Sequence, residues 1–390
     1  MGLTSQEGNR LRTLRFAVRC GVLAALVVFS IPLLPWTWTP LVAPAISPFV
    51  TICSAIAART LTVASWIGVP FVAVALLKRR WLCRNICPVG LLIEVVGKFG
   101  SSKAASLPPI GQWIALVTFA GACLGYPLLL WMDPMAMFSG FFGVFHAATV
   151  LSAIGLPVVL IVSLIWPNAW CAKLCPLGAT QDLLALPRRF LRRTRPEPAS
   201  GDDQPLARRT VLAMGLGAAW AAATLKFARG EGREAIRPPG AIVERRFTGV
   251  CVRCGNCVRV CPSKIIQPDI GQHGIAGFLA PVVGFEKGYC LETCRRCTEV
   301  CPSGAILRLS LEQKRKTRIG LAQVNMEHCL LGEEKECSIC LNRCPYQAIT
   351  IAFDRESYTN IPRIARDKCP GCGACELACP TSPKAITVCP

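Results

Sequence analysis

The hydrophobic pattern divides the chain into an apolar first half and a more polar second half. Four apolar runs reach, or nearly reach, the length of about 20 residues that crosses a bilayer core. They lie at residues 15–34, 60–77, 110–131 and 145–166. The segment 40–58 is also apolar, but Pro40, Pro44 and Pro48 interrupt it, so we expect an interfacial or re-entrant stretch there. The pattern predicts an α-helical membrane domain with four spans.

The distribution of basic residues predicts the orientation of these spans. Of the Lys and Arg residues that give the chain its net charge of +20, 18 lie in the segments 1–19, 78–103 and 173–209. The loops 35–58 and 132–144 contain none. Because basic loops of membrane proteins face the cytoplasm, we expect the N-terminus and residues 78–109 and 167–209 to be cytoplasmic. The same explanation of the charge predicts no nucleic-acid partner.

A fifth apolar run, 210–225, follows the adjacent Arg208 and Arg209 in "LARRTVLAMGLGAAW". Two arginines before a weakly apolar run are typical of a twin-arginine signal, which exports proteins already folded. The alternative is an ordinary fifth span. Either interpretation places the C-terminal part on the side of the membrane opposite the cytoplasm. The predicted domains are a polytopic domain (1–187), a basic linker (188–209), a signal or anchor helix (210–228), a second linker (229–248) and a cysteine-rich C-terminal domain (249–390).

The membrane domain contains an internal repeat. "WLCRNICPVG" at 81–90 and "AWCAKLCPLG" at 169–178 share the pattern Cys-x3-Cys-Pro at a constant offset, and each follows a pair of predicted spans. Two tandem repeats related by an axis along the bilayer normal would bring the motifs together at the cytoplasmic face. We therefore expect Cys83, Cys87, Cys171 and Cys175 to converge on one further cluster or metal ion. The alternative is four structural or redox-active thiols.

Four cysteine runs follow residue 248, each ending in Cys-Pro. Their members are Cys251, Cys254, Cys257 and Cys261; Cys290, Cys294, Cys297 and Cys301; Cys329, Cys337, Cys340 and Cys344; and Cys369, Cys372, Cys375 and Cys379. The first and fourth runs have the Cys-x2-Cys-x2-Cys-x3-Cys-Pro spacing of bacterial [4Fe–4S] ferredoxins, and the middle two depart from it only in their first interval. Zinc ribbons and disulfide frameworks do not show this phasing. The runs predict four [4Fe–4S] clusters in an α+β, ferredoxin-like polyferredoxin domain at 249–390, with short strands in the apolar segments that follow them.

The fourth cysteine of a ferredoxin run binds the cluster of a partner run, so the runs must pair. We expect nested pairing, runs one with four and two with three, because the outer runs are regular and the inner ones are not. Cluster one would then use Cys379 as its fourth ligand. Sequential pairing would place Cys301 there instead.

Two residues are weak candidates for a quinol site. Asp133 is the one carboxylate predicted in the outer loops, and His146 is the one histidine of the membrane domain. Asp133 could accept a proton there. One histidine also excludes a bis-histidine haem within this domain.

With these motifs in place, the chain resembles two known proteins joined end to end. Residues 10–190 resemble the NapH/MauN type of membrane ferredoxin-associated protein, in the motifs Cys83/Cys87 and Cys171/Cys175. Residues 205–390 resemble the exported NapG/MauM type, in the four cluster motifs behind Arg208 and Arg209. Membrane proteins of this type usually carry further ferredoxin motifs, which this chain lacks between Cys175 and Cys251.

The resemblance implies that electrons pass from membrane quinol to a periplasmic cytochrome or reductase. We expect a component of a quinol dehydrogenase, with the membrane quinone pool as its electron source. The alternative is a redox maturation factor that keeps a partner's metal centre or thiol reduced. A structural anchor for a redox complex is a third function consistent with the motifs.

Overall fold

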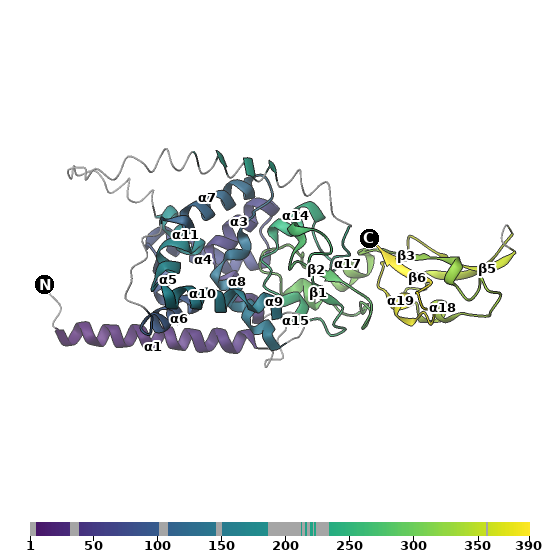
Figure 1. Cartoon of the computed structure of the whole chain (residues 1–390), viewed down its shortest axis with the longest axis horizontal. Helices are drawn as coiled ribbons and strands as arrows, with labels where there is room; N and C mark the ends of the chain where they lie inside the picture. Colours follow the sequence, from purple (N-terminus) through teal and green to yellow (C-terminus); the bar gives the residue numbers. More distant parts are fainter. Residues whose placement is uncertain are drawn as a thin grey trace. The chain divides into compact units, whose positions relative to one another are not determined.

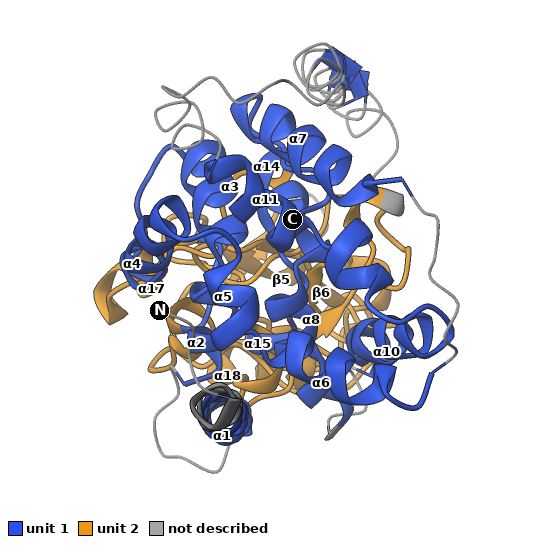
Figure 2. Cartoon of the chain, turned by 90° about the vertical axis from the view of Figure 1, so that its left-hand side faces the viewer, with its two compact units in different colours: residues 1–231, 245–256, 300–305 blue, residues 232–244, 257–299, 306–390 orange. Residues whose placement is uncertain are grey.

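The computed structural model describes residues 5–31, 39–100, 108–145, 150–185, 234–355 and 358–390, together with seven positions between 212 and 223. The chain divides into two compact units, coloured in Figure 2. Unit 1 comprises residues 1–231, 245–256 and 300–305. Unit 2 comprises residues 232–244, 257–299 and 306–390. The first ferredoxin run is therefore shared between the two units, with Cys251 and Cys254 in unit 1.

Unit 1 is helical where the structure describes it (Figure 1). Its α-helices are α1 (Ser5–Ser30), α2 (Val42–Ala45), α3 (Pro48–Ala58), α4 (Val63–Leu77), α5 (Trp81–Asn85), α6 (Pro88–Gly97), α7 (Ile110–Cys123), α8 (Pro134–Phe141), α9 (Val150–Ala153), α10 (Gly155–Ile165), α11 (Pro176–Leu184) and α14 (Glu244–Val250). The 3-10 helices η1 (Thr39–Leu41), η2 (Leu130–Met132) and η3 (Phe142–Phe145) and the π-helix η5 (Trp170–Leu174) connect them.

The predicted internal repeat is visible in the order and packing of these helices. In the first half α4 leads through α5 to α6, and in the second half α10 leads through η5 to α11. Helix α1 packs on α6 as α7 packs on α11, and α3 packs on α4 as α8 packs on α10. Contacts of α2 with α8 and of α3 with α7 join the halves. The largest fully buried side chains of this unit, including Phe49, Leu82, Ile93, Leu130 and Leu177, come from both halves.

One described helix is long and apolar enough to cross a membrane, namely α1 over Thr13–Ser30. The pair Thr39–Ala45 and Pro48–Ala58 would raise the number to two if it counted as one span, but it bends by 92°. This bend agrees with the break predicted from the prolines of 40–58. The other predicted spans contain apolar helices of 10–17 residues. The structure therefore does not confirm the expectation of four spans, which stays a prediction.

The segment 132–144 differs from the predicted outer loop. It forms η2, α8 and most of η3, and the side chains of Asp133, Met135, Phe138 and Ser139 are buried. Asp133 is the one charged residue in this segment. The segment therefore has few polar groups that favour contact with water, and burial of its apolar side chains stabilises α8. The sequence showed that this segment lacks basic residues, but it did not indicate that the segment packs as a buried helix.

Unit 2 contains short strands and short helices in its described part. The strands are β1 (Ile266–Pro268), β2 (Pro281–Val283), β3 (Leu321–Val324), β4 (Ile349–Asp354), β5 (Thr359–Ile364) and β6 (Ile386–Cys389). They form three antiparallel two-stranded sheets, β1–β2, β3–β6 and β4–β5. The helices are α15 (Asn256–Arg259), α16 (Arg296–Glu299), α17 (Leu311–Lys316), α18 (Ile339–Arg343) and α19 (Ala374–Ala378), with the 3-10 helices η6 (Ile275–Gly277) and η7 (Met326–His328).

Three of the four strands predicted after cysteine runs are present, as β1, β4 and β6. The fourth, predicted within residues 304–309, forms only an isolated bridge between Ile306 and Ala241. The core of unit 2 is built around the cysteines themselves, with Ile265, Phe285, Ile349 and Ile386 among its buried apolar residues. This α+β arrangement agrees with the ferredoxin-like class predicted for the C-terminal part.

Several sequence predictions fall on residues outside the described ranges. These are Arg208, Arg209, the linker at 188–209, most of the helix at 210–228, and His146. The second linker, predicted at 229–248, is in part structured, because α14 begins at Glu244 and Phe247 is fully buried. A Cβ atom built at Gly249 would lie 2.7 Å from the ring of Tyr126, so α14 packs closely on the loop after α7.

Candidate functional sites

The two Cys-x3-Cys-Pro motifs form equivalent local structures. Cys87 is the N-cap of α6 and Cys175 is the N-cap of α11, and each has extended backbone angles. Pro88 and Pro176 follow at the first helical position, where a missing N–H costs nothing. The amide of Gly90 donates to Cys87 Sγ at 3.4 Å, and the amide of Gly178 lies near Cys175 at the matching place. Each second cysteine therefore points its sulfur at the start of a helix.

The four thiols of these motifs lie within electrostatic range of one another. The pKa values of Cys87 and Cys175 are each raised by burial first and then by the nearby Cys83 and Cys171. Burial likewise raises the pKa of Cys83 to about 12 and that of Cys171 to about 11. Thiols with raised pKa values ionise readily only when a metal cation compensates the thiolate charge. The donor set therefore suits an iron–sulfur cluster, held by Cys83, Cys87, Cys171 and Cys175, which we call the inner quartet.

Polar side chains next to the inner quartet connect the two halves. Gln181 Nε2 donates to Cys83 Sγ at 3.0 Å, and Gln181 Oε1 accepts from the amide of Leu82 at 3.2 Å. Arg80 donates to the carbonyl of Cys171 and to Asp182, which also binds Arg79. The positive charge of Arg80 lowers the pKa of Cys83 and Cys171, in opposition to burial. These contacts hold the two motifs in register and favour their thiolate forms.

A close backbone approach also shapes this site. A Cβ atom at Gly111 would lie 2.8 Å from the carbonyl oxygen of Cys175, closer than a side chain tolerates. Glycine therefore allows the first turn of α7 to lie against the backbone of η5 and Cys175. The sequence alone did not mark Gly111, because nothing in its neighbourhood distinguishes it from other helical glycines.

Asp133 is completely buried and serves as the N-cap of α8. Its carboxylate accepts hydrogen bonds from the amides of Met135 and Ala136, both at 3.0 Å, and from Ser47 Oγ at 2.6 Å. Burial raises its pKa to about 6, although these hydrogen bonds oppose the shift. Its charge raises the pKa of Cys87, so Asp133 lies within electrostatic range of the inner quartet. Asp133 therefore lies in a buried site at the start of α8 and not in an exposed outer loop.

Helix α8 runs from this carboxylate to the first ferredoxin motif. Near its other end, Ser139 donates to Asn256 Oδ1 at 3.0 Å. Asn256 Nδ2 donates to the carbonyl of Pro40 at 2.9 Å and lies 3.5 Å from the carbonyl of Val300. A Cβ atom at Gly140 would lie 3.8 Å from the carbonyl oxygen of Cys254. The first motif is thus fixed to the helices of unit 1 through Asn256, a residue that the sequence pattern did not indicate.

In unit 2 the second run gathers around the last cysteine of the first run. One cavity is lined by Cys261, Cys290, Cys294 and Cys297. Burial raises the pKa of Cys297, and the three other thiols add to the effect. Lys314, which is buried and donates to the carbonyl of Leu291, lowers the pKa of Cys290 against the effect of burial. Lys314 is a functional neighbour that the sequence did not indicate, because it lies in a charged helix that looks solvent-exposed.

The fourth run is arranged in the same way with the last cysteine of the third. A second cavity is lined by Cys344, Cys369, Cys372 and Cys375. Burial raises the pKa of Cys372 to about 11 and that of Cys375 to about 12, and Cys344 contributes to both shifts. In the third run, Cys329 and Cys337 raise the pKa of Cys340 after burial. Each of these groups offers thiolates for one [4Fe–4S] cluster.

This arrangement shows that the expectation of nested pairing was wrong. Cys261 completes the second run and Cys344 completes the fourth, which is sequential pairing of runs one with two and three with four. It leaves Cys301 for the first run and Cys379 for the third. The reason is chain connectivity, because closing a short loop costs less entropy than closing a long one. Irregular spacing of two runs contains no information about which runs are neighbours.

The second and fourth runs adjoin within unit 2. The amide of Cys290 donates to the carbonyl of Cys372 at 2.8 Å. Tyr346 lines the cavity of the fourth run, and burial raises its pKa, with added contributions from Cys372 and Cys290. Tyr346 therefore lies near thiols of both runs. The binding motifs of the two pairs meet here rather than at runs one or three.

No group of three or more His, Cys, Asp or Glu side chains among the described residues is arranged to hold a single metal ion. A lone zinc ion with bonds of about 2.3 Å would need its thiolates in contact with each other. A cubane places a separate iron beside each thiolate, so its ligands stand farther apart. The described cysteine groups thus lack the arrangement that a single-ion site requires.

Two family models match the chain, and each matches twice. The 4Fe-4S binding domain model matches residues 59–105 and 148–195, which contain the two Cys-x3-Cys-Pro motifs. The 4Fe-4S dicluster domain model matches residues 250–305, which contain the first two cysteine runs, and residues 335–382, which contain the last three cysteines of the third run and all of the fourth. The second match agrees with sequential pairing. No solved structure matches the chain.

Several ferredoxin-type proteins are similar in sequence. The ferredoxin-type protein NapG of Escherichia coli K12 is 36% identical over 165 residues, which cover 40% of this chain and 70% of NapG. The methylamine utilization ferredoxin-type protein MauM of Methylobacillus flagellatus is 34% identical over 199 residues, covering 47% of this chain and 80% of MauM. The ferredoxin-type protein NapF of E. coli K12 is 33% identical over 150 residues, covering 38% and 81%. The chain therefore belongs to the family of ferredoxin-type iron–sulfur electron-transfer proteins that includes NapG and MauM.

Proposed function

We propose that this protein oxidises membrane quinol and passes the electrons to a periplasmic cytochrome or reductase. It would lie in the bacterial cytoplasmic membrane, with its N-terminus in the cytoplasm and its polyferredoxin domain in the periplasm. Its membrane part would correspond to a NapH/MauN-like protein fused to the NapG/MauM-like part. Four [4Fe–4S] clusters would be bound by the four runs and a fifth by the inner quartet. Each cluster supplies a centre that accepts and releases one electron.

The observation that supports this proposal is that unit 1 contains both the inner quartet and cysteines of the ferredoxin runs. The inner quartet belongs to the same compact unit as Cys251, Cys254 and Cys301. Helix α8 extends from Asp133, within electrostatic range of Cys87, to Gly140, next to the backbone of Cys254. Eight helical residues span about 12 Å. Helix α8 therefore connects the surroundings of the inner quartet to the first ferredoxin motif within unit 1.

Asp133 is the proposed proton acceptor for quinol, because its carboxyl group is buried and its pKa is raised. A buried carboxyl group with a pKa of about 6 can take up or release a proton near neutral pH. Its hydrogen bonds to Ser47 and to the start of α8 fix its position. His146, the second candidate, lies outside the described residues, and its contribution to a quinol site is a prediction from the sequence alone.

The test combines a cofactor count with a redox measurement on the full chain in detergent. The wild-type protein should contain about 20 iron and 20 sulfide per chain, five clusters in all. A Cys87→Ser/Cys175→Ser variant should contain about 16 of each. It should keep the EPR signals of the periplasmic clusters after chemical reduction but no longer be reduced by quinol. The matched control is Cys20→Ser/Cys123→Ser, which removes two thiols outside the motifs.

Two results would contradict the proposal. A wild-type count of about 16 iron per chain would mean that the inner quartet is a set of thiols without a cluster. Unchanged quinol-dependent reduction in the Cys87/Cys175 variant would remove these residues from electron entry. Five clusters with no reaction toward quinol would instead favour a role in redox maturation of a partner.

A further inference from the structure

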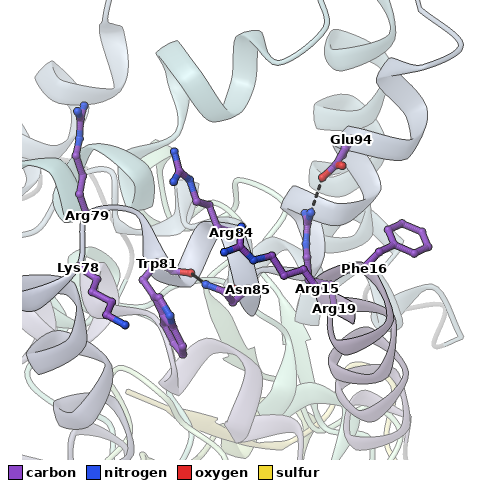
Figure 3. A pocket seen from close by; sticks show the side chains of 9 residues that line it. All are labelled: Arg15, Phe16, Arg19, Lys78, Arg79, Trp81, Arg84, Asn85 and Glu94. Atoms are coloured by element: carbon purple, nitrogen blue, oxygen red, sulfur yellow. Dashed lines mark hydrogen bonds and ion pairs between the residues drawn. The ribbon is translucent and has the colours of Figure 1, made fainter. Parts of the chain in front are cut away.

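A cavity of about 550 Å³ lies between α1 and the α4–α5 connection, and none of its lining residues is a cysteine (Figure 3). Five of its lining side chains are cationic: Arg15, Arg19, Lys78, Arg79 and Arg84. Glu94 is the one carboxylate that lines it. The cavity therefore has an excess of four positive charges within a volume typical of small-ligand sites.

Only part of this charge is used by ion pairs. Arg79 binds Asp182 through Nε at 2.6 Å and through its terminal nitrogen at 3.2 Å, and Arg19 forms an ion pair with Glu94. Within the described part of the chain, no ion pair involves Arg15, Lys78 or Arg84. Figure 3 shows Arg84 and Arg15 in the middle of the cavity, with Lys78 and Arg79 on one side and Arg19 on the other. Three cations thus face the same space without neutralisation by protein carboxylates.

A buried donor points to the same conclusion. Arg19 is largely buried, with 14% of its side chain exposed. Its Nε–H has no hydrogen-bond acceptor among the described residues, although the atom is shielded from solvent. Buried polar groups almost always have a partner, because an unsatisfied donor costs free energy. An anion in the cavity would accept a hydrogen bond from Arg19 and would neutralise part of the positive charge of the other cationic residues.

Apolar side chains identify the kind of anion. Phe16 and Trp81 also line the cavity, and Phe16 is 45% exposed. On α1, Leu14 and Val18 are exposed as well, at 62% and 52%. Arg15 and Arg19 lie in the first turns of Thr13–Ser30, the described helix long and apolar enough to cross a membrane. A ligand with an anionic head and an apolar body fits both surfaces, whereas free phosphate fits only the first.

We propose that this cavity binds the phosphate of an anionic membrane phospholipid, with the acyl chains along the exposed apolar side of α1. Arginine suits this role because its planar guanidinium binds two phosphate oxygens at once. Lys78 and Arg79 directly follow α4. Arg84 lies on α5 next to Cys83 and shortly before Cys87, and both cysteines belong to the inner quartet. The lipid would hold α1 against the motif that binds the inner cofactor.

The test measures lipid binding to the full chain by native mass spectrometry in a neutral detergent. The probes are dioleoylphosphatidylglycerol, dioleoylphosphatidylcholine and inorganic phosphate. The variant is Arg15→Gln/Arg84→Gln, which removes two exposed cations that make no ion pair among the described residues. The control is Arg343→Gln/Arg366→Gln, with two exposed arginines of unit 2 and the same change in net charge.

We expect phosphatidylglycerol to bind the wild type and the control more tightly than phosphatidylcholine does. Its affinity should fall by roughly 10- to 30-fold in the Arg15/Arg84 variant, as expected for the loss of two cations near a lipid headgroup. Equal phosphatidylglycerol binding by the variant and the wild type would overturn the site. If inorganic phosphate bound as tightly as phosphatidylglycerol, the ligand would be a free phosphate compound and the lipid proposal would be wrong. Circular dichroism of both variants without lipid checks that they fold.

Discussion

Ser47 Oγ donates a hydrogen bond of 2.6 Å to Asp133 Oδ1, and both residues are fully buried. Each is an N-cap followed by a proline, Ser47 on α3 and Asp133 on α8. The two halves of the repeat therefore meet at equivalent helix starts. Helix N-termini favour negative charge, so both caps stabilise an ionised Asp133 although burial disfavours it.

Replacement of Asp133 by Asn should change how stability depends on pH. The folded-state pKa of Asp133, about 6, exceeds its usual value of 3.8. Its favourable contribution is therefore present below the usual value and is lost as the pH rises through about 6. Asn caps helices as well as Asp does but cannot titrate. Between pH 5 and 7.5, we expect the unfolding midpoint of the wild type to fall relative to Asp133→Asn by roughly 3 °C.

Asp182→Asn is the matched control for this measurement. The pKa of Asp182 is lowered by Arg79 and Arg80, which together outweigh its burial. It is ionised throughout this pH range, so its replacement should lower the midpoint equally at every pH. A constant difference between the wild type and Asp133→Asn would show that Asp133 does not titrate in this range.

Sequential pairing predicts which ligand substitutions alter the same cluster. Cys261→Ser should change the EPR signal that Cys294→Ser changes, because both residues line one cavity. Cys344→Ser should change the signal that Cys372→Ser changes, for the same reason. A serine ligand binds iron more weakly and alters the reduction potential of its cluster. Nested pairing requires the opposite result, in which Cys261→Ser and Cys372→Ser alter a common signal.

The sequence predicted the chemistry of this protein better than its packing. The spacing of the cysteines predicted the cluster motifs, since local turns determine which thiols can converge. The offset between Cys87 and Cys175 predicted the repeat, which the order of the helices and the doubled family match both show. The pairing of runs could not be derived from their spacing, because it depends on the lengths of loops and on the contacts of strands such as β3 and β6.

Helix ends and buried polar contacts were also beyond the sequence. Apolar composition did not show that α7 ends at Cys123, where the backbone turns through Gly125 with a φ of +84°. The helix-like run around Asp133 looked like a loop because it is short and lacks basic residues. Asn256 gave no signal, since one polar residue inside a cysteine run is ordinary. Its significance comes from its contacts with residues more than 100 positions away.

Replacement of Asn256 by Ala should loosen the first ferredoxin motif. The substitution removes the hydrogen bond from buried Ser139 and the one to the carbonyl of Pro40. Each such loss costs about 1–3 kcal/mol. We expect amide hydrogen exchange of residues 245–256 to accelerate by at least tenfold. Asn342→Ala is the control, because Asn342 is exposed and contacts Ser338 of its own turn. Equal protection in Asn256→Ala and the wild type would mean that other contacts hold this segment.

The export signal predicted at Arg208 and Arg209 can be tested by localisation. These arginines precede a weakly apolar run and a domain whose thiols need reducing conditions until their clusters are assembled. Export in the folded state would protect the clusters from oxidation. Arg208→Lys/Arg209→Lys should therefore keep residues 230–390 in the cytoplasm, where protease added to spheroplasts cannot reach them. Arg192→Lys/Arg193→Lys is the control, since that adjacent pair is not followed by an apolar run. If protease cut the C-terminal domain as efficiently in both variants as in the wild type, residues 210–225 would act as an ordinary span, because lysine serves as well as arginine in setting membrane orientation.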